Sequence, residues 1–212
     1  MKRIFVTCTW VIPFLLALVG VAALARSRAP TSTGDAEVLT EELRAEPRLL
    51  IAHKGQYRLR LYSRGKLVKT YVIGLGQSPV GQKQDQGDNR TPEGRYRITQ
   101  KLPGPFPGTY GAFLGSRWIG LGYPNDQDAE AGLRRGVLTK AQVEQIRAAN
   151  RAGSQPPQDT RLGGGIGIHG WSGKWPGDDR QNVTWGCISL QNPDLEDLYD
   201  RIEVGTLIVI LP

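Results

Sequence analysis

A cysteine and a histidine near the C-terminal end of the chain have the types and surroundings of a nucleophilic pair. Cys187 follows a glycine in the stretch 184–187 (TWGC), and His169 precedes one in 167–170 (GIHG). A free thiol has a pKa of about 8.5, so a thiol nucleophile needs a base that takes its proton and holds the thiolate as an ion pair. His169 is the natural base, because the other histidine, His53, is expected to be a surface or turn residue ending a strand.

The neighbours of this pair fit the same chemistry. Gly186 lacks a Cβ and lets a carbonyl substrate approach the backbone, and its amide is predicted to form an oxyanion hole together with that of Cys187. Gly170 leaves room beside the histidine in a similar way. Three tryptophans crowd the segment and either wall a cleft or pack in the core: Trp171, Trp175 and Trp185.

The composition is that of an ordinary globular protein and excludes several classes of function. The chain has 212 residues, 39% hydrophobic and 22% charged, with a formal net charge of +7. This basic excess is too diffuse to predict nucleic-acid binding, although it suits an anionic surface such as a cell wall. Two cysteines exclude a disulfide-dense scaffold, and two histidines make an all-protein zinc cage hard to build. We therefore expect no metal and no cofactor.

The N-terminus is predicted to direct export. Lys2 and Arg3 precede an uncharged run from Ile4 to Ala25, and residues 23–25 (ALA) fit a small-x-small cleavage site. The run also reaches the length of about 20 residues that spans a bilayer, so residues 1–25 are either a signal peptide or an apolar helical membrane anchor. In both cases the rest of the chain is expected to be exported, and in the second case this helix tethers it to a membrane. An intramolecular disulfide to Cys187 is not expected.

The remaining chain divides into a linker and one domain. Residues 26–47 are predicted to be a linker and a short helix over 36–46, ended by Pro47. Alternating apolar and charged residues predict a hairpin over 56–75 with a turn at 63–66, and a further strand is expected over 94–100. Residues 78–90 and 101–111 are predicted to be loops.

Helical signals interrupt this β pattern. Thr139 and Gln142 form a predicted capping box, so a helix is expected to run to about Asn150 within an inserted segment, 125–153. Asn192 is predicted to cap a last helix, and residues 207–211 a final buried strand. The sum is one mainly β domain over 48–212 with helical insertions.

The order and spacing of these segments resemble the L,D-transpeptidase (YkuD-type) catalytic domain. The segment 169–187, which begins HG and ends TWGC, is similar to the family's His-Gly…[Ser/Thr]-x-Gly-Cys signature. Residues 90–96 (RTPEGRY) resemble its Thr-Pro-x-Gly-x-Tyr/Phe segment. The hairpin at 56–75 and residues 122–125 (GYPN) resemble the start and middle of the family's domain. The resemblance covers about residues 48–212.

This resemblance implies a β-sandwich-like catalytic domain that acts on peptidoglycan stem peptides through a thioester. It also implies a location in the bacterial periplasm or cell envelope, with an uncleaved leader as an anchor in the inner membrane. Cys187 would be the nucleophile and His169 the base and then the acid, with the Gly186 and Cys187 amides as oxyanion donors. The amine acceptor would be peptidoglycan or protein. Four further residues are expected near the substrate, with Thr184 either orienting His169 or touching substrate: Thr184, Trp185, Gly170 and Ser189.

Ser189 departs from the family pattern, which commonly has arginine at this position. An arginine would grip a carboxylate or carbonyl with two hydrogen bonds, which serine cannot do. Either other residues therefore bind the substrate, or the substrate differs from that of the family. Two alternatives to a transpeptidase stay open: an L,D-carboxypeptidase or peptidoglycan amide hydrolase of the same fold, and an inactive cell-wall-binding module.

Overall fold

The computed structural model describes residues 35–171 and 181–212, all within one compact unit, 33–212. The predicted leader over 1–25 and Trp175 lie outside the described residues. Among the residues described, no helix combines the length and the apolar character that crossing a bilayer requires.

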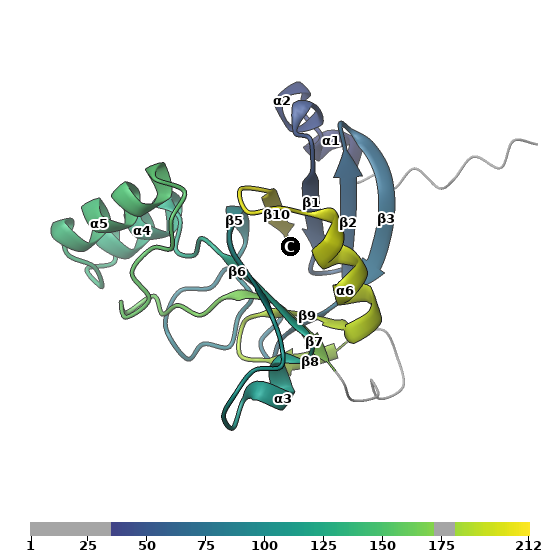
Figure 1. The fold of residues 1–212 in the computed structure, drawn as a ribbon. Helices are drawn as coiled ribbons and strands as arrows, with labels where there is room; N and C mark the ends of the chain where they lie inside the picture. Colours follow the sequence, from purple (N-terminus) through teal and green to yellow (C-terminus); the bar gives the residue numbers. More distant parts are fainter. Residues whose placement is uncertain (1–34, 172–180) are drawn as a thin grey trace, which may run out of the picture. The chain divides into compact units, whose positions relative to one another are not determined.

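Ten strands of the described chain form one sheet in the order β3-β2-β1-β10-β5-β6-β7-β9-β4-β8. Their bounds are β1 Leu49–His53, β2 Arg58–Ser63, β3 Lys66–Val72, β4 Gly74–Gly76, β5 Gly94–Pro103, β6 Arg117–Leu121, β7 Gly167–Trp171, β8 Gln181–Thr184, β9 Ile188–Gln191 and β10 Leu207–Leu211. The long strand β5 belongs to both halves, because residues 94–97 pair with β10 and residues 98–103 pair with β6. The sheet therefore curls into the mainly β, sandwich-like domain that was predicted (Figure 1).

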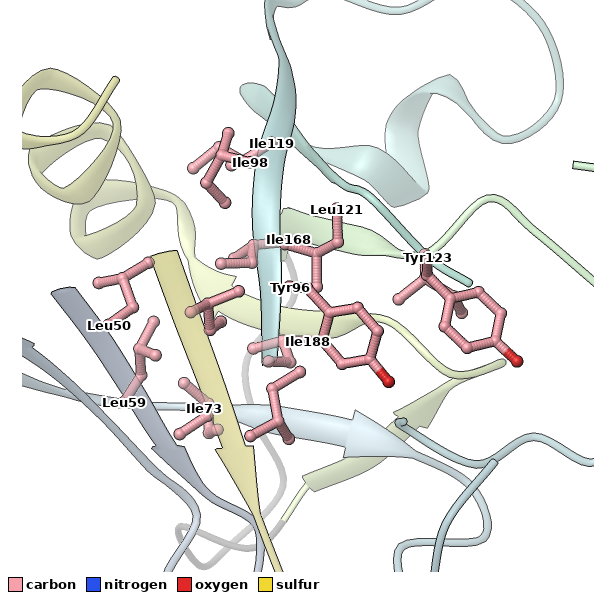
Figure 2. Close-up of a cluster of buried hydrophobic side chains, with 14 of the residues drawn as sticks. Leu50, Leu59, Ile73, Tyr96, Ile98, Ile119, Leu121, Tyr123, Ile168 and Ile188 are labelled. Carbon is pink, nitrogen blue, oxygen red and sulfur yellow. The ribbon is translucent and has the colours of Figure 1, made fainter. Parts of the chain in front are cut away.

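The main hydrophobic core is enclosed by the two halves of the sheet. Leu50 of β1 and Leu59 of β2 point from one half toward Ile98, Ile119 and Ile168 on strands of the other half (Figure 2). All five side chains are fully buried. Burial of this kind stabilises the fold by about 1.5–3 kcal/mol for each large aliphatic side chain.

The segment before β1 packs on the outer face of the same strands. It forms two short helices, α1 Asp35–Val38 and α2 Glu41–Ala45, where one short helix was predicted. Leu43 of α2 packs with Leu49 and Ile51, which alternate along β1 with the residues that face the main core. Strand β1 is consequently buried on both faces.

A buried polar cluster fixes the start of this segment to the sheet. The Asp35 carboxylate accepts hydrogen bonds from His53, from Tyr62 and, at 3.2 Å, from Arg60. The prediction that His53 is a surface or turn residue is therefore wrong, since its side chain is almost completely buried at the end of β1. Its partner, Asp35, lies in the segment before the strand, and no local sequence pattern predicts this contact.

The other helices are α3 Gly111–Leu114, α4 Asp126–Arg134, α5 Lys140–Arg151 and α6 Asn192–Arg201. The predicted hairpin and the final strand are confirmed, and so is the capping box of Thr139 and Gln142 at the start of α5. Helix α4, which has its own capping box on Asn125, was not predicted.

The predicted N-cap of the last helix is wrong. Gln191 holds the N-cap position of α6, and Asn192 is the first helical residue. The Asn192 Oδ1 atom instead accepts a hydrogen bond from the Ser116 amide, 3.2 Å away. This side chain therefore joins the start of α6 to the turn before β6, which no local sequence signal indicates.

Candidate active site

His169 lies in the middle of β7 and is completely buried. Its Nδ1 atom is 2.8 Å from the carbonyl oxygen of Gly170, and because a carbonyl only accepts, Nδ1 carries the proton. Nε2 is thereby left with its lone pair, and it has no hydrogen-bond partner among the described residues. Burial lowers the pKa of His169, although the backbone of Gly170 and Phe113 acts in the opposite direction. The resting side chain is thus a neutral imidazole with a proton-accepting nitrogen.

Cys187 lies just before β9 and is a free cysteine. Its thiol donates a hydrogen bond to the Gly165 carbonyl, with Sγ and O 3.3 Å apart. Burial raises the pKa of the Cys187 thiol to about 11, against smaller opposing effects of the Gly167 backbone and the Lys83 charge. Burial and the hydrogen bond to Gly165 therefore both favour the protonated form of the Cys187 thiol.

Adjacent parallel strands bring the two residues together. Strand β7 pairs with β9 so that Ile168 is opposite Ile188 and His169 is opposite Ser189. Because side chains alternate along a strand, the two isoleucines enter the main core, whereas His169 and Cys187 belong to the other face. The sequence alone did not show that the two residues lie on one side of the sheet, and the pairing of β7 with β9 does.

Cys187 and His169 line one cavity of about 440 Å³. The other lining residues are Leu102, Phe106, Tyr110, Phe113, Leu114, Trp118, Gly164, Gly165, Ile166, Thr184 and Trp185. Within the part of the chain that the structure describes, no charged side chain lines this cavity. Its wall is mainly aromatic and aliphatic, with few polar atoms besides the thiol and the imidazole.

The turn that presents Cys187 is held by Thr184. The buried Thr184 hydroxyl donates to the Cys187 carbonyl at 2.7 Å and accepts from the Gly186 amide at 3.2 Å. Gly186 has a φ of +133°, and an added Cβ would lie 2.9 Å from the carbonyl oxygen of Arg90. The Thr184 hydroxyl thus bonds the backbone on both sides of the Gly186–Cys187 peptide, and among the described residues it makes no hydrogen bond to His169. The Gly186 amide, one of the two expected oxyanion donors, is engaged by this hydroxyl.

Three further residues predicted near the substrate have different surroundings. The Trp185 side chain is 54% exposed at the cavity and its ring packs edge-on against Tyr110 at 5.6 Å. A Cβ on Gly170 would collide with Asn192 Oδ1, so this glycine permits close packing and does not leave room for substrate. Ser189 is completely buried beside Gly74 and does not line the cavity, so a direct substrate contact by this residue is not supported.

Sequence reasoning missed the opposite wall of the cavity. The segment 101–111 was predicted to be a loop, and the chain from Leu102 to Trp118 supplies most of the aromatic lining. Phe113 in α3 is central, because its ring lies 5.3 Å from that of Trp185 and 5.5 Å from that of Trp171. The recurrence of aromatic residues at 106, 110 and 113 was the one available signal.

Comparison with known proteins identifies the domain. The model of the YkuD family, described as the L,D-transpeptidase catalytic domain, matches residues 47–210. No curated protein matches this chain. Among the described residues, no group of three or more His, Cys, Asp or Glu side chains is arranged to hold a metal ion.

Two solved structures share the fold at low sequence identity, and a third is less similar. The helical cell shape determining protein Pgp2 from Campylobacter jejuni is 21% identical with a TM-score of 0.50, over 82% of this chain and 52% of that one. Bd1075 from Bdellovibrio bacteriovorus is 22% identical with a TM-score of 0.51, over 78% and 48%. An L,D-transpeptidase from Mycobacterium smegmatis is 14% identical with a TM-score of 0.47, over 79% and 59%. This chain spans about half the length of the first two structures.

Proposed function

Because the chain belongs to the L,D-transpeptidase catalytic domain family, we propose that it is a cysteine L,D-transpeptidase acting on peptidoglycan stem peptides. One observation carries this proposal: His169 on β7 and Cys187, just before the neighbouring strand β9, line the same apolar cavity. The hydrogen bond from His169 Nδ1 to Gly170 supports it, because that bond leaves Nε2 free to accept a proton.

In the proposed first half-reaction, Cys187 Sγ attacks the carbonyl carbon of the amide that follows the third stem residue. Its proton moves to His169 Nε2 as the attack proceeds, since both groups are neutral at rest. Collapse of the tetrahedral intermediate breaks the C–N bond, and the terminal D-amino acid leaves as an amine with the proton from Nε2. The product is a thioester on Cys187.

In the second half-reaction, an amine acceptor attacks the thioester. His169 Nε2 takes a proton from the attacking amine and returns it to the departing sulfur, which restores the thiol. The acceptor is an amine of peptidoglycan or of a protein. Among the cavity residues, we assign Trp185 to substrate contact because it is exposed at the cavity.

The oxyanion of the tetrahedral intermediate requires donors near Cys187. We assign this role to the amides of Gly186 and Cys187. The Gly186 amide donates to Thr184 at rest, so its use requires this amide to exchange the 3.2 Å bond to Thr184 for a bond to the substrate oxygen. Thr184 keeps its second bond, to the Cys187 carbonyl, throughout.

Membership of this family is also the basis for two further proposals, that the chain is exported and that it has a role in cell shape. We propose that residues 1–25 direct the chain to the cell envelope and that its substrate there is peptidoglycan. The partners implied are stem peptides and an amine acceptor, and nucleic acid is not among them. The similarity to a protein described as determining helical cell shape supports testing cell morphology in strains that lack this chain.

Hydrolysis is the second candidate, and one observation favours it. The described lining of the cavity contains no charged side chain that would hold an amine acceptor by its carboxylate or ammonium group. With water as the acceptor, the thioester would be hydrolysed and the chain would act as an L,D-carboxypeptidase or peptidoglycan amide hydrolase.

The test is incubation of the full chain with a purified disaccharide-tetrapeptide and mass spectrometry of the products. Cross-linked dimers, or exchange of the terminal D-amino acid, would establish the transferase. Tripeptide alone would establish the hydrolase. Cys187→Ala is the control that must lose both activities while keeping its melting temperature. Absence of turnover with Cys187 unmodified would contradict both candidates and favour the wall-binding module.

A further inference from the structure

The imidazole of His169 must become positively charged when it accepts the thiol proton, yet it is completely buried. In a Ser-His-Asp or similar triad, a carboxylate or amide supports this cation. Here the hydrogen-bond acceptor at Nδ1 is the neutral carbonyl of Gly170. A buried cation without further support is costly, so the surroundings of the ring decide how readily it forms.

No charged side chain of the described residues supports the imidazolium from the packed elements. On β6, Arg117 bonds the Ser116 carbonyl and lies over the ring of Tyr199. On α6, the two aspartates nearest its start, Asp194 and Asp197, pair with Lys69. On β9, His169 is opposite the uncharged Ser189, and the neighbouring thiol of Cys187 is neutral at rest.

Aromatic rings flank the imidazole instead. The Phe113 ring lies 5.0 Å from it, centroid to centroid, at an interplanar angle of 43°. Trp118 is the direct cross-strand neighbour of His169 on β6, and its ring is stacked on the imidazole at 6.4 Å and 14°. The faces of aromatic rings carry negative potential and attract cations within about 6 Å, tryptophan most strongly.

We propose that Phe113 and Trp118 are positioning residues that stabilise the His169 imidazolium through their ring faces. The proposal rests on the proposed cysteine chemistry, in which the Sγ–H bond breaks, the proton binds Nε2, and positive charge appears on the ring. Phe113 lies within the usual range for such an attraction and carries the proposal first. Trp118 lies slightly beyond that range but has the stronger ring.

The test distinguishes an electrostatic effect of the aromatic ring faces from an effect of side-chain packing. Phe113→Leu and Trp118→Leu keep an apolar side chain but remove the ring, whereas Phe113→Tyr and Trp118→Phe keep a ring. The full chain has two histidines, so NMR titration of ¹³C-labelled histidine resolves His169 after assignment with His169→Gln. We expect each leucine variant to lower the His169 pKa by ~0.5–1 unit and the aromatic variants to restore most of it.

A matched control is Phe106→Leu, which removes a ring from the same cavity wall. Phe106 has no ring contact with His169 among the described residues, so this variant should leave the His169 pKa at its wild-type value. In the enzymatic assay, the leucine variants of Phe113 and Trp118 should lower kcat by ~3–10-fold with a smaller change in KM, because the cation forms only during reaction.

Folded leucine variants that keep the wild-type pKa of His169 would overturn the proposal, as would an equal shift in Phe106→Leu. If Trp118→Leu fails to fold, Phe113→Leu alone decides, since its site in α3 is outside the sheet. The titration is made without substrate. A negative titration therefore contradicts this inference, whereas missing turnover in the wild-type chain contradicts the proposed function.

Discussion

The Cys187 thiol and the Gly165 carbonyl are joined by a hydrogen bond of 3.3 Å at the cavity wall. A carbonyl oxygen accepts a proton-bearing group and repels a thiolate, so this contact favours the neutral thiol. It acts in the same direction as burial, which raises the Cys187 pKa to about 11. Both effects favour the protonated thiol, so in the proposed reaction Cys187 depends on His169 to take its proton.

Alkylation of Cys187 should consequently be slow at neutral pH. We expect its rate with iodoacetamide to rise with pH toward a midpoint near 11, about 2 units or more above that of an ordinary free thiol. Intact-mass kinetics on Cys8→Ser, which removes the other cysteine, measure this rate directly. A midpoint below pH 8 would mean that the resting enzyme already holds a thiolate.

Gly186→Ala should displace Cys187, the proposed nucleophile. The backbone at +133° is a conformation that side chains rarely adopt, and the new Cβ would meet the Arg90 carbonyl at 2.9 Å. We expect a loss of ~1–3 kcal/mol in the free energy of unfolding and at least ~100-fold in kcat/KM, because Cys187 is displaced. Urea denaturation and the peptide assay check the two effects.

Gly136→Ala is the matched control for that variant. Gly136 also has a positive φ, +71°, but a Cβ there would meet nothing within 4 Å. It lies between α4 and α5, outside the cavity residues. The control should lose stability with little change in kcat/KM. An equal loss of activity in both variants would show that general destabilisation, and not the position of Cys187, explains the effect of Gly186→Ala.

Thr184→Val tests the turn that presents Cys187. Valine has nearly the same shape but cannot bond the Gly186 amide or the Cys187 carbonyl, which are 3.2 Å and 2.7 Å from the hydroxyl. We expect a loss of ~1–3 kcal/mol in stability and a ~10-fold or larger fall in kcat. Thr184→Ser keeps the hydroxyl and should remain near wild type in both measurements. If Thr184→Val matches Thr184→Ser in kcat, the hydroxyl has no role in positioning Cys187.

Local signals in the sequence were sufficient for elements whose determinants lie close together in the chain. The hairpin of β2 and β3 follows from alternation around one turn, and the start of α5 follows from Thr139 and Gln142, three residues apart. Cys187 and His169 were recognised from their neighbours. Their shared cavity depends on the pairing of β7 with β9, which local pattern does not specify.

The errors share one physical cause, because each concerns a side chain whose partner is distant in sequence. His53 is buried by Asp35 in a helix on the outer face, and Asn192 bonds Ser116 in place of capping its own helix. Phe113 reaches the imidazole only because α3 folds back against β7. Ser189 has the position of a substrate contact in the sequence, yet the close approach of Gly74 encloses it.

The buried Asp35 carboxylate, which holds α1 against the sheet, gives a prediction about how stability depends on pH. Burial acts to raise the pKa of Asp35, but hydrogen bonds from Tyr62 and His53 and the charge of Arg60 outweigh it, so the pKa is lowered. A lowered pKa in the folded state means that the carboxylate stabilises the fold above the unfolded-state pKa. That contribution is lost as pH falls through the folded-state pKa.

Asp35→Asn should therefore destabilise the protein at pH 7 by about 3 kcal/mol, because it leaves the buried Arg60 guanidinium without its charged partner. The deficit relative to wild type should begin to shrink below the unfolded-state pKa of about 3.9, where the unfolded wild-type chain binds a proton that the folded carboxylate does not. Glu37→Gln, on the exposed side of the same helix, should change stability by less than ~0.5 kcal/mol at either pH. Urea denaturation at pH 7 and pH 3 measures the free energy of unfolding of all three chains. If the deficit of Asp35→Asn is the same at both pH values, the Asp35 charge does not stabilise the packing of α1 on the sheet.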